Sequence, residues 1–217
     1  MTQSSTGSKL RSVSSWHREF LALLASSSLL VQLAAISVCC AAPLAESTAF
    51  RWVQEQGRSV ALVQGDAVVW RFNFGSEQPK PNFFPLCLPA RPSLVVDRPS
   101  DHPWHHGLWF SWKFLNGVNF WEPDPKTGKS PGRTAWSDVK PTLHADFSAT
   151  IALQLAYITA GDAAVLREDR EIALSAPDEF GRYTIDWRST FRAVEKDVEL
   201  SCVPIPPAQD GVPWGGY

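Results

Sequence analysis

The amino-acid sequence predicts an all-β fold: an antiparallel β-sandwich, either a jelly roll or a mutarotase-like supersandwich. Apolar and polar residues alternate with period two along most of the chain after its N-terminal segment. Turn-forming residues separate these runs roughly every 8 to 12 residues, a spacing typical of sandwiches. The 17 prolines and 13 glycines lie mostly between the runs and leave little room for helices. We therefore expect about eight or more strands.

The strand expected at Arg182–Ala193 shows the alternation most clearly. One of its faces is apolar and the other carries charged residues and threonines, as in a strand with one solvated face. Residues 144–160 are expected to form one or two strands, with a helix as the alternative because alanine and leucine are frequent there. We expect the other strands at residues 50–56, 59–64, 67–74, 83–88, 93–96, 107–114, 163–175 and 197–203.

The N-terminal segment, residues 1–45, differs in kind from the rest. Basic residues at Lys9, Arg11 and Arg18 precede a long uncharged stretch and a cluster of small alanines. This order is typical of a secretory signal peptide, so we expect a secreted or periplasmic domain at residues 46–217. An uncleaved membrane anchor is the alternative, because about 20 apolar residues span a bilayer.

Charge and cysteine content narrow the classes of partner. The net charge of −2 gives no reason to expect nucleic acid or an anionic membrane as a partner. We expect a carbohydrate or another small molecule, with membrane contact only through an uncleaved N-terminal segment. Export would permit a disulfide between Cys87 and Cys202, and two free thiols are the alternative.

Three of the five histidines lie within five residues, in the segment Asp101-His102-Pro103-Trp104-His105-His106-Gly107. One interpretation is a site for a divalent metal, with His102 and His105 as ligands and Glu122 or Glu168 as a third. The identity of any cofactor stays open at this point.

A second interpretation is acid–base chemistry on a sugar, because histidine titrates near neutral pH. The candidate catalytic residues are His102, His105, His106 and Glu168. Tryptophans would stack on sugar rings, and amides and carboxylates would bind hydroxyl groups. The candidate substrate-binding residues are Asp101, Trp104, Trp109, Asn116, Asn119 and Glu122.

A structural interpretation competes with both for the aromatic run after the histidines. Aromatic side chains are the main content of a sandwich core, so residues 109–114 are expected to supply core side chains. Within this run, the face with Trp109, Ser111 and Lys113 is expected to be the more open one. Asn116-Gly117 predicts a hairpin turn.

The charged residues Glu168, Asp169 and Arg170 interrupt an otherwise alternating segment. We expect them on a solvated strand face. If Glu168 instead faces inward, it is the carboxylate expected to pair with the histidines.

The run DHPWHHGLWFSWKFLNGVNFWE, residues 101–122, resembles the hallmark of a bacterial secreted family that carries the label methane oxygenase PmoA and has essentially no known function. The shared pattern comprises Asp101 to Pro103, His105-His106, Gly107 to Phe110, Asn116 to Val118 and Phe120-Trp121. The resemblance covers about residues 50–217. Members of that family run further, so the resemblance implies a C-terminally truncated sandwich that lacks part of the site.

Three hypotheses about function follow. The first is an enzyme acting on a carbohydrate outside the cytoplasm. The second is a glycan-binding module without turnover. The third takes the family label literally and predicts a copper- or iron-dependent oxygenase. A particulate methane monooxygenase subunit is a bundle of membrane helices, and this chain has no apolar run of about 18 residues after its signal segment.

Overall fold

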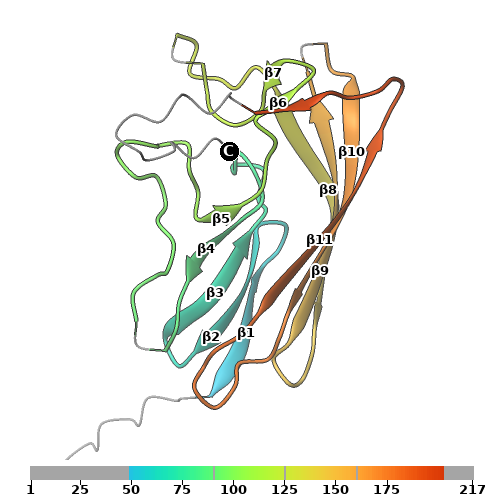
Figure 1. Ribbon diagram of the computed structural model, residues 1–217. Helices are drawn as coiled ribbons and strands as arrows, with labels where there is room; N and C mark the ends of the chain where they lie inside the picture. The colour runs from blue at the N-terminus through green and yellow to red at the C-terminus, as the bar shows by residue number, and fades with distance from the viewer. Residues whose placement is uncertain (1–48, 90, 125, 160, 203–217) are drawn as a thin grey trace, which may run out of the picture. The chain divides into compact units, whose positions relative to one another are not determined.

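The computed structural model describes residues 49–89, 91–124, 126–159 and 161–202. These residues form twelve strands in three antiparallel sheets and no helix, which confirms the predicted all-β class (Figure 1). Accordingly, no helix in this part of the chain could cross a membrane. The expected signal peptide or anchor and residues 203–217 lie outside the described residues.

Two large sheets and one small sheet make up the fold. The first sheet has the order β1-β2-β3-β4-β5, formed by Phe50–Glu55, Ser59–Gln64, Ala67–Asn73, Asn82–Leu86 and Leu108–Trp109. The second sheet has the order β11-β10-β9-β8, formed by Ile185–Ala193, Ala164–Leu174, Ala149–Ile158 and Arg133–Leu143. The small sheet has the order β12-β6-β7, formed by Leu200–Ser201, Phe114–Leu115 and Val118–Asn119.

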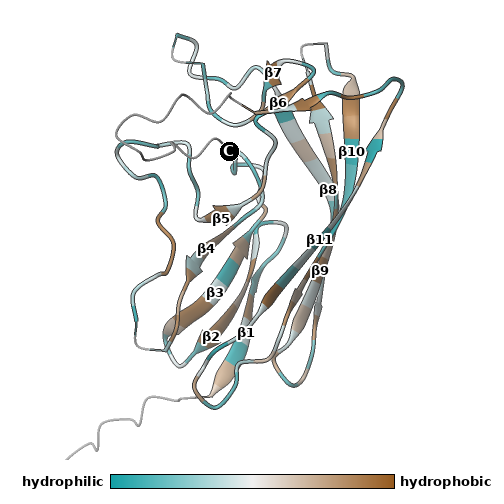
Figure 2. Cartoon of the chain, in the orientation of Figure 1, coloured by the Kyte–Doolittle hydropathy of each residue, from teal (hydrophilic) through white to brown (hydrophobic). Residues whose placement is uncertain are grey.

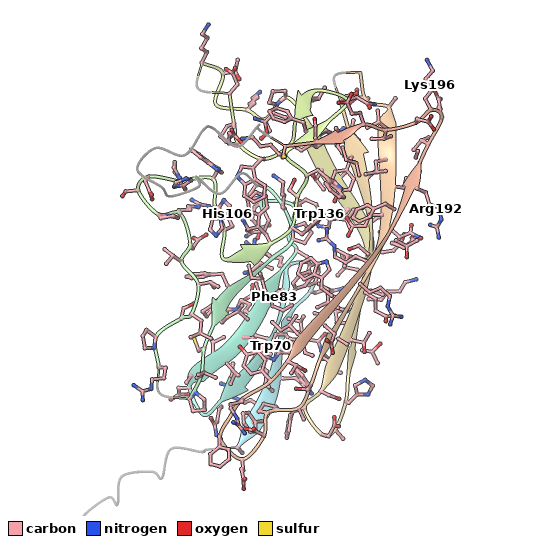
Figure 3. The ribbon with its side chains drawn as sticks, in the orientation of Figure 1. Trp70, Phe83, His106, Trp136, Arg192 and Lys196 are labelled. Atoms are coloured by element: carbon pink, nitrogen blue, oxygen red, sulfur yellow. The ribbon has the colours of Figure 1, made fainter. Side chains whose placement is uncertain are left out.

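The two large sheets share one hydrophobic core, as in a sandwich. Trp70 and Phe83 of the first sheet belong to the same buried cluster as Ile151 and Ile172 of the second. Trp70 and Phe83 lie in the space between the two layers in Figure 3. Burying a large apolar side chain stabilises a fold by about 1.5–3 kcal/mol, so this cluster is the main source of stability.

Polar tips of aromatic side chains also connect the sheets. The Trp136 indole N–H donates to the carbonyl of Phe74 at 2.8 Å, and the Tyr183 hydroxyl donates to the carbonyl of Val69 at 3.3 Å. Each bond joins a residue of the second half of the chain to the first sheet. A buried indole or phenol needs such a partner, so these bonds fix how the two layers face each other.

Period-two alternation governs the second sheet. In β9 every second residue from Ala149 to Tyr157 is buried, so the helix considered for residues 144–160 is wrong and the strand is confirmed. In β11 Trp187 and Phe191 face the core, while Arg188 and Arg192 face solvent. In Figure 2, hydrophobic and hydrophilic residues are mixed along the strands.

The segment expected as one strand at 107–114 is instead broken. Only β5 and β6 are strands, and residues 110–113 lie between them without ladder pairing. The expected exposure is reversed: Trp109 and Ser111 are buried, whereas Phe110 and Trp112 are half-buried. The cause is the pairing of β5 with β4, where Trp109 lies opposite Asn82 and stacks on Trp121.

Of the smaller predictions, some are confirmed and some are wrong. Asn116 and Gly117, both at positive φ, form the predicted hairpin turn between β6 and β7. Residues 93–96 form no strand, because the Ser93 hydroxyl bonds to the backbone of Leu86 and Val95 instead. Cys87 and Cys202 are free thiols, the second of them exposed.

Candidate acid–base site

The histidine segment runs along the edge of the first sheet, next to β5. An isolated bridge pairs Asp97 with His106, and the amide of Arg98 donates to the carbonyl of His105 at 2.7 Å. The amide of Gly107 donates to the carbonyl of Val96 at 3.0 Å. The segment therefore folds back on itself as a closed loop whose two ends meet at Asp97 and His106.

Gly107 is required where this loop joins β5. Its φ is +61°, a conformation that side chains other than glycine rarely adopt. A Cβ atom at this position would lie 2.1 Å from the carbonyl oxygen of Phe83 in β4. The loop can approach the sheet this closely only because residue 107 has no side chain.

The buried imidazole of His106 pairs with the half-buried carboxylate of Asp97. His106 Nδ1 lies 2.8 Å from Asp97 Oδ1, and the His106 side chain is 9% exposed. A carboxylate only accepts hydrogen bonds, so Nδ1 carries the proton and Nε2 of the neutral ring keeps its lone pair. Burial lowers the pKa of His106 below its ordinary 6.5, although the charge of Asp97 opposes this shift. At neutral pH His106 is therefore a neutral base held in one tautomer.

His105 is held in the opposite tautomer. The indole N–H of Trp109 donates to His105 Nδ1 at 3.2 Å, and an indole nitrogen can only donate. The proton of the neutral His105 ring therefore resides on Nε2. Neighbouring histidines thus present one acceptor and one donor nitrogen.

Lys80 lies over the Trp109 ring, with Nζ 4.5 Å from the ring centroid. The residue is only 7% exposed, and it reaches this place because β4, which starts two residues later, pairs with β5. The side chain of Asn82 fixes the local backbone by donating to the carbonyl of Lys80 at 3.1 Å. Burial lowers the pKa of Lys80 to about 8, although the charge of Glu122 opposes this shift.

Glu122 is the carboxylate whose charge acts on Lys80. Its Oε1 forms a close ion pair with Lys113, while its Oε2 is buried without a hydrogen-bond partner among the described residues. The Asn119 side chain accepts from the amides of Trp121 and Glu122, which sets the turn that brings the carboxylate here. An unpartnered buried carboxylate oxygen calls for a partner such as an ordered water or an ion.

The other predicted site residues lie further out or serve the fold. His102 and Asp101 form an exposed pair at 3.0 Å, and the His102 ring lies 5.3 Å from the ring of Trp104. The indole N–H of Trp104 is buried without a partner in the described part of the chain. Asn116 binds the backbone of Glu199 next to β12, so its side chain serves the small sheet.

The expectation that Glu168 and Arg170 lie on a solvated face is wrong. Both are buried, and Glu168 accepts hydrogen bonds from Tyr157, Ser189 and two nitrogens of Arg170 at 2.5–2.9 Å. They share the parity of apolar residues in β10 and therefore point into the core. The hydrogen bonds of Glu168 go to this network, and none of them goes to a histidine.

Sequence reasoning missed Lys80 and Lys113 as members of the site. Lys80 stands between two prolines just before an apolar strand, an unusual place for a buried charge, but only strand pairing brings it to Trp109. Within residues 49–202 as described, no three His, Cys, Asp or Glu side chains group as metal ligands would. The described donors around His102 and His105 thus do not form a closed ligand set.

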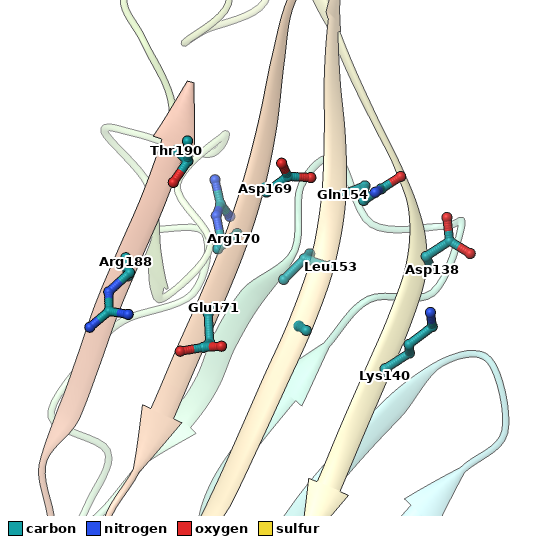
Figure 4. A pocket seen from close by; sticks show the side chains of 10 residues that line it. Asp138, Lys140, Leu153, Gln154, Asp169, Arg170, Glu171, Arg188 and Thr190 are labelled. Atoms are coloured by element: carbon teal, nitrogen blue, oxygen red, sulfur yellow. The ribbon is translucent and has the colours of Figure 1, made fainter. Parts of the chain in front are cut away.

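A shallow depression of about 460 Å³ lies elsewhere, on the outer face of the second sheet (Figure 4). Charged side chains such as Asp138, Lys140, Glu171 and Arg188 surround the small residue Ala152 at its floor. The depression shares no lining residue with the histidine segment. Its chemistry is that of a solvated strand face, so the histidine segment remains the candidate site.

The fold and this cluster define the chain as an all-β protein with a candidate acid–base site at one sheet edge. Residues 59–211 match the model of a family of unknown function, DUF6807, and the chain belongs to this family. Neither the curated proteins nor the solved structures include a match to the chain.

Proposed function

We propose that this protein is an enzyme that uses His106 as a general base on a carbohydrate, with Asp97 holding the imidazole in position. The single observation that carries the proposal is the hydrogen bond of 2.8 Å between the buried His106 imidazole and the half-buried Asp97 carboxylate. A histidine oriented in this way presents an unprotonated Nε2 at neutral pH, the property that proton abstraction from a hydroxyl group requires.

Carbohydrate is the substrate class that the surroundings of His106 favour. Trp104 and Trp121 are half-buried, so each leaves part of its surface accessible on this side of the fold. Sugars combine apolar C–H faces with hydroxyl groups, and they bind where aromatic surface lies beside polar atoms. The unpartnered Glu122 Oε2 and Trp104 Nε1 provide an acceptor and a donor for such hydroxyls.

Interconversion of sugar anomers tests the proposal, because ring opening and closure need one base and one acid. Exchange NMR on the full chain with D-glucose, D-galactose and D-xylose measures the rate directly. We expect acceleration of at least one sugar, and a loss of about 10²–10⁴-fold in both His106→Asn and Asp97→Asn. His144→Asn, which alters an exposed histidine in the β8–β9 turn, is the matched control and should keep the full rate.

Three outcomes contradict the proposal. Saturable sugar binding without acceleration would support a glycan-binding module instead. Neither binding nor acceleration would remove carbohydrate as the substrate class. A stoichiometric metal found by elemental analysis and lost in the His102→Ala/His105→Ala variant would favour the metal-dependent oxygenase that the label of the resembling family implies.

A further inference from the structure

Lys80 is the buried charged residue that a general-base mechanism leaves unexplained. Lys80 is only 7% exposed, and its Nζ lies 4.5 Å from the centroid of the Trp109 ring. A lysine is seldom buried unless it is paired, because removing an ammonium group from water is expensive. Among the described residues Lys80 Nζ forms no ion pair and no hydrogen bond, since Glu122 uses its Oε1 on Lys113.

We propose that the Lys80 amine is a nucleophile that captures the carbonyl carbon of an open-chain sugar or a related hydroxy-aldehyde as an imine. The inference rests on the proposed function, because opening of a sugar ring is the step that exposes an aldehyde at this site. It adds a covalent intermediate and narrows the substrate class to carbohydrates with a free carbonyl group.

The local geometry suits this chemistry at each step. The neutral amine attacks the carbonyl carbon, a C–N bond forms, and the carbonyl oxygen becomes a hydroxyl group. Loss of that hydroxyl as water then leaves a C=N bond, and no oxidant or reductant is needed. Glu122, the carboxylate whose charge acts on Lys80, would take the amine proton and return it to the departing hydroxyl.

The protonation state of Lys80, which its burial sets, also suits the role. A lysine with a pKa of about 8 has a substantial neutral fraction at pH 7.5, whereas an ordinary lysine has almost none. The aromatic face of Trp109 stabilises the cationic form of the amine without competing for its nitrogen lone pair after deprotonation. Desolvation therefore keeps part of the amine neutral and reactive, although the aromatic face favours the cation.

Reductive trapping tests the inference on the full-length protein. The protein is incubated with D-glyceraldehyde and sodium cyanoborohydride at pH 7.5, and each lysine is followed by peptide mass spectrometry. A trapped imine adds the mass of one aldehyde less one oxygen atom. We expect Lys80 to react at least about tenfold faster than the exposed Lys126 and Lys129 in the same sample.

Variants test whether the rate of trapping at Lys80 reflects a reactive amine or only a buried one. Glu122→Gln keeps the shape of the side chain but removes the proton-transferring carboxylate. It should slow trapping at Lys80 and leave Lys129 unchanged, even though losing the Glu122 charge increases the neutral fraction of Lys80. Lys129→Arg, at an exposed loop position, should leave trapping at Lys80 unchanged. Equal or slower reaction of Lys80 compared with the exposed lysines in wild-type protein overturns the inference, and that comparison does not depend on any variant folding.

The trapping experiment and the anomer experiment can fail separately. Sugar exchange that depends on His106 without trapping at Lys80 overturns only the imine. Trapping at Lys80 without sugar exchange overturns only the acid–base proposal and leaves a carbonyl-binding amine.

Discussion

At the scale of single residues, the candidate site includes a side chain that opposes folding. Lys80 is the clearest case, because folding lowers its pKa from 10.5 to about 8. Below pH 8 the amine is charged in both the folded and the unfolded chain, so the fold bears the full cost of burying the charge. Above pH 10.5 it is neutral in both, and the cost disappears.

Replacing Lys80 with methionine should therefore stabilise the protein. The difference between pKa values of 10.5 and about 8 corresponds to roughly 3 kcal/mol, so we expect a gain of about 1–3 kcal/mol at pH 7. The gain should shrink towards pH 10, and urea unfolding at both pH values measures it. A destabilised Lys80→Met variant at pH 7 would show that the ammonium is well compensated. A gain in stability would fit the proposed role of Lys80, because active-site residues commonly lower stability.

At the scale of elements, the loop from Asp97 to Gly107 depends on one close backbone approach. Gly107→Ala places a methyl group against the carbonyl of Phe83 and also forces alanine to positive φ. The backbone conformation alone costs about 1–2 kcal/mol, and the clash adds to it. We expect a loss of more than about 2 kcal/mol in the free energy of unfolding, together with loss of trapping at Lys80.

Gly117→Ala is the matched control for that variant. Gly117 has a similar φ of +74°, but a Cβ atom there would meet nothing within 4 Å. This variant should cost only about 1 kcal/mol and should leave the histidine segment intact. Equal losses in the two variants would mean that the conformation, and not the contact with β4, decides the need for glycine at position 107.

The sequence could predict elements whose information is local. Apolar and polar residues alternate cleanly in β9 and β11, and the residue types of Asn116-Gly117 predict a turn. The interruption after Trp109 was not predictable, because it depends on a partner strand and on stacking against Trp121.

The candidate site likewise has residues that the sequence could predict and one that it could not. Clustered histidines and the nearby Glu122 were visible in the sequence, whereas Lys80 joins them only through the pairing of β4 with β5. For Glu168 a usable signal existed, since it shares the parity of Leu166 and Ile172, both of which are buried. The charge of Glu168 favours a solvated face, whereas its parity in the strand favours the buried face that the structure shows.

At the scale of the whole molecule, the buried network around Glu168 ties three strands of the second sheet together and reaches Phe110, next to β5. Tyr157 of β9, Arg170 of β10 and Ser189 of β11 all donate to Glu168. The guanidinium of Arg170 also lies 5.7 Å from the ring of Phe110, next to β5. The network therefore extends from the second sheet towards the segment that carries the candidate site.

Removing the charge of Glu168 should weaken the entire fold. Glu168→Gln leaves the Arg170 cation buried without a counter-charge, a change that typically costs about 3–5 kcal/mol. Glu171→Gln, on the exposed face of the same strand, removes the same charge and should cost less than about 1 kcal/mol. Urea unfolding of both variants measures the difference, and anomer exchange on the folded fraction of Glu168→Gln should remain, because Glu168 does not contact the histidines. Loss of exchange in the folded fraction, with stability little changed, would instead place Glu168 within the chemistry of the site.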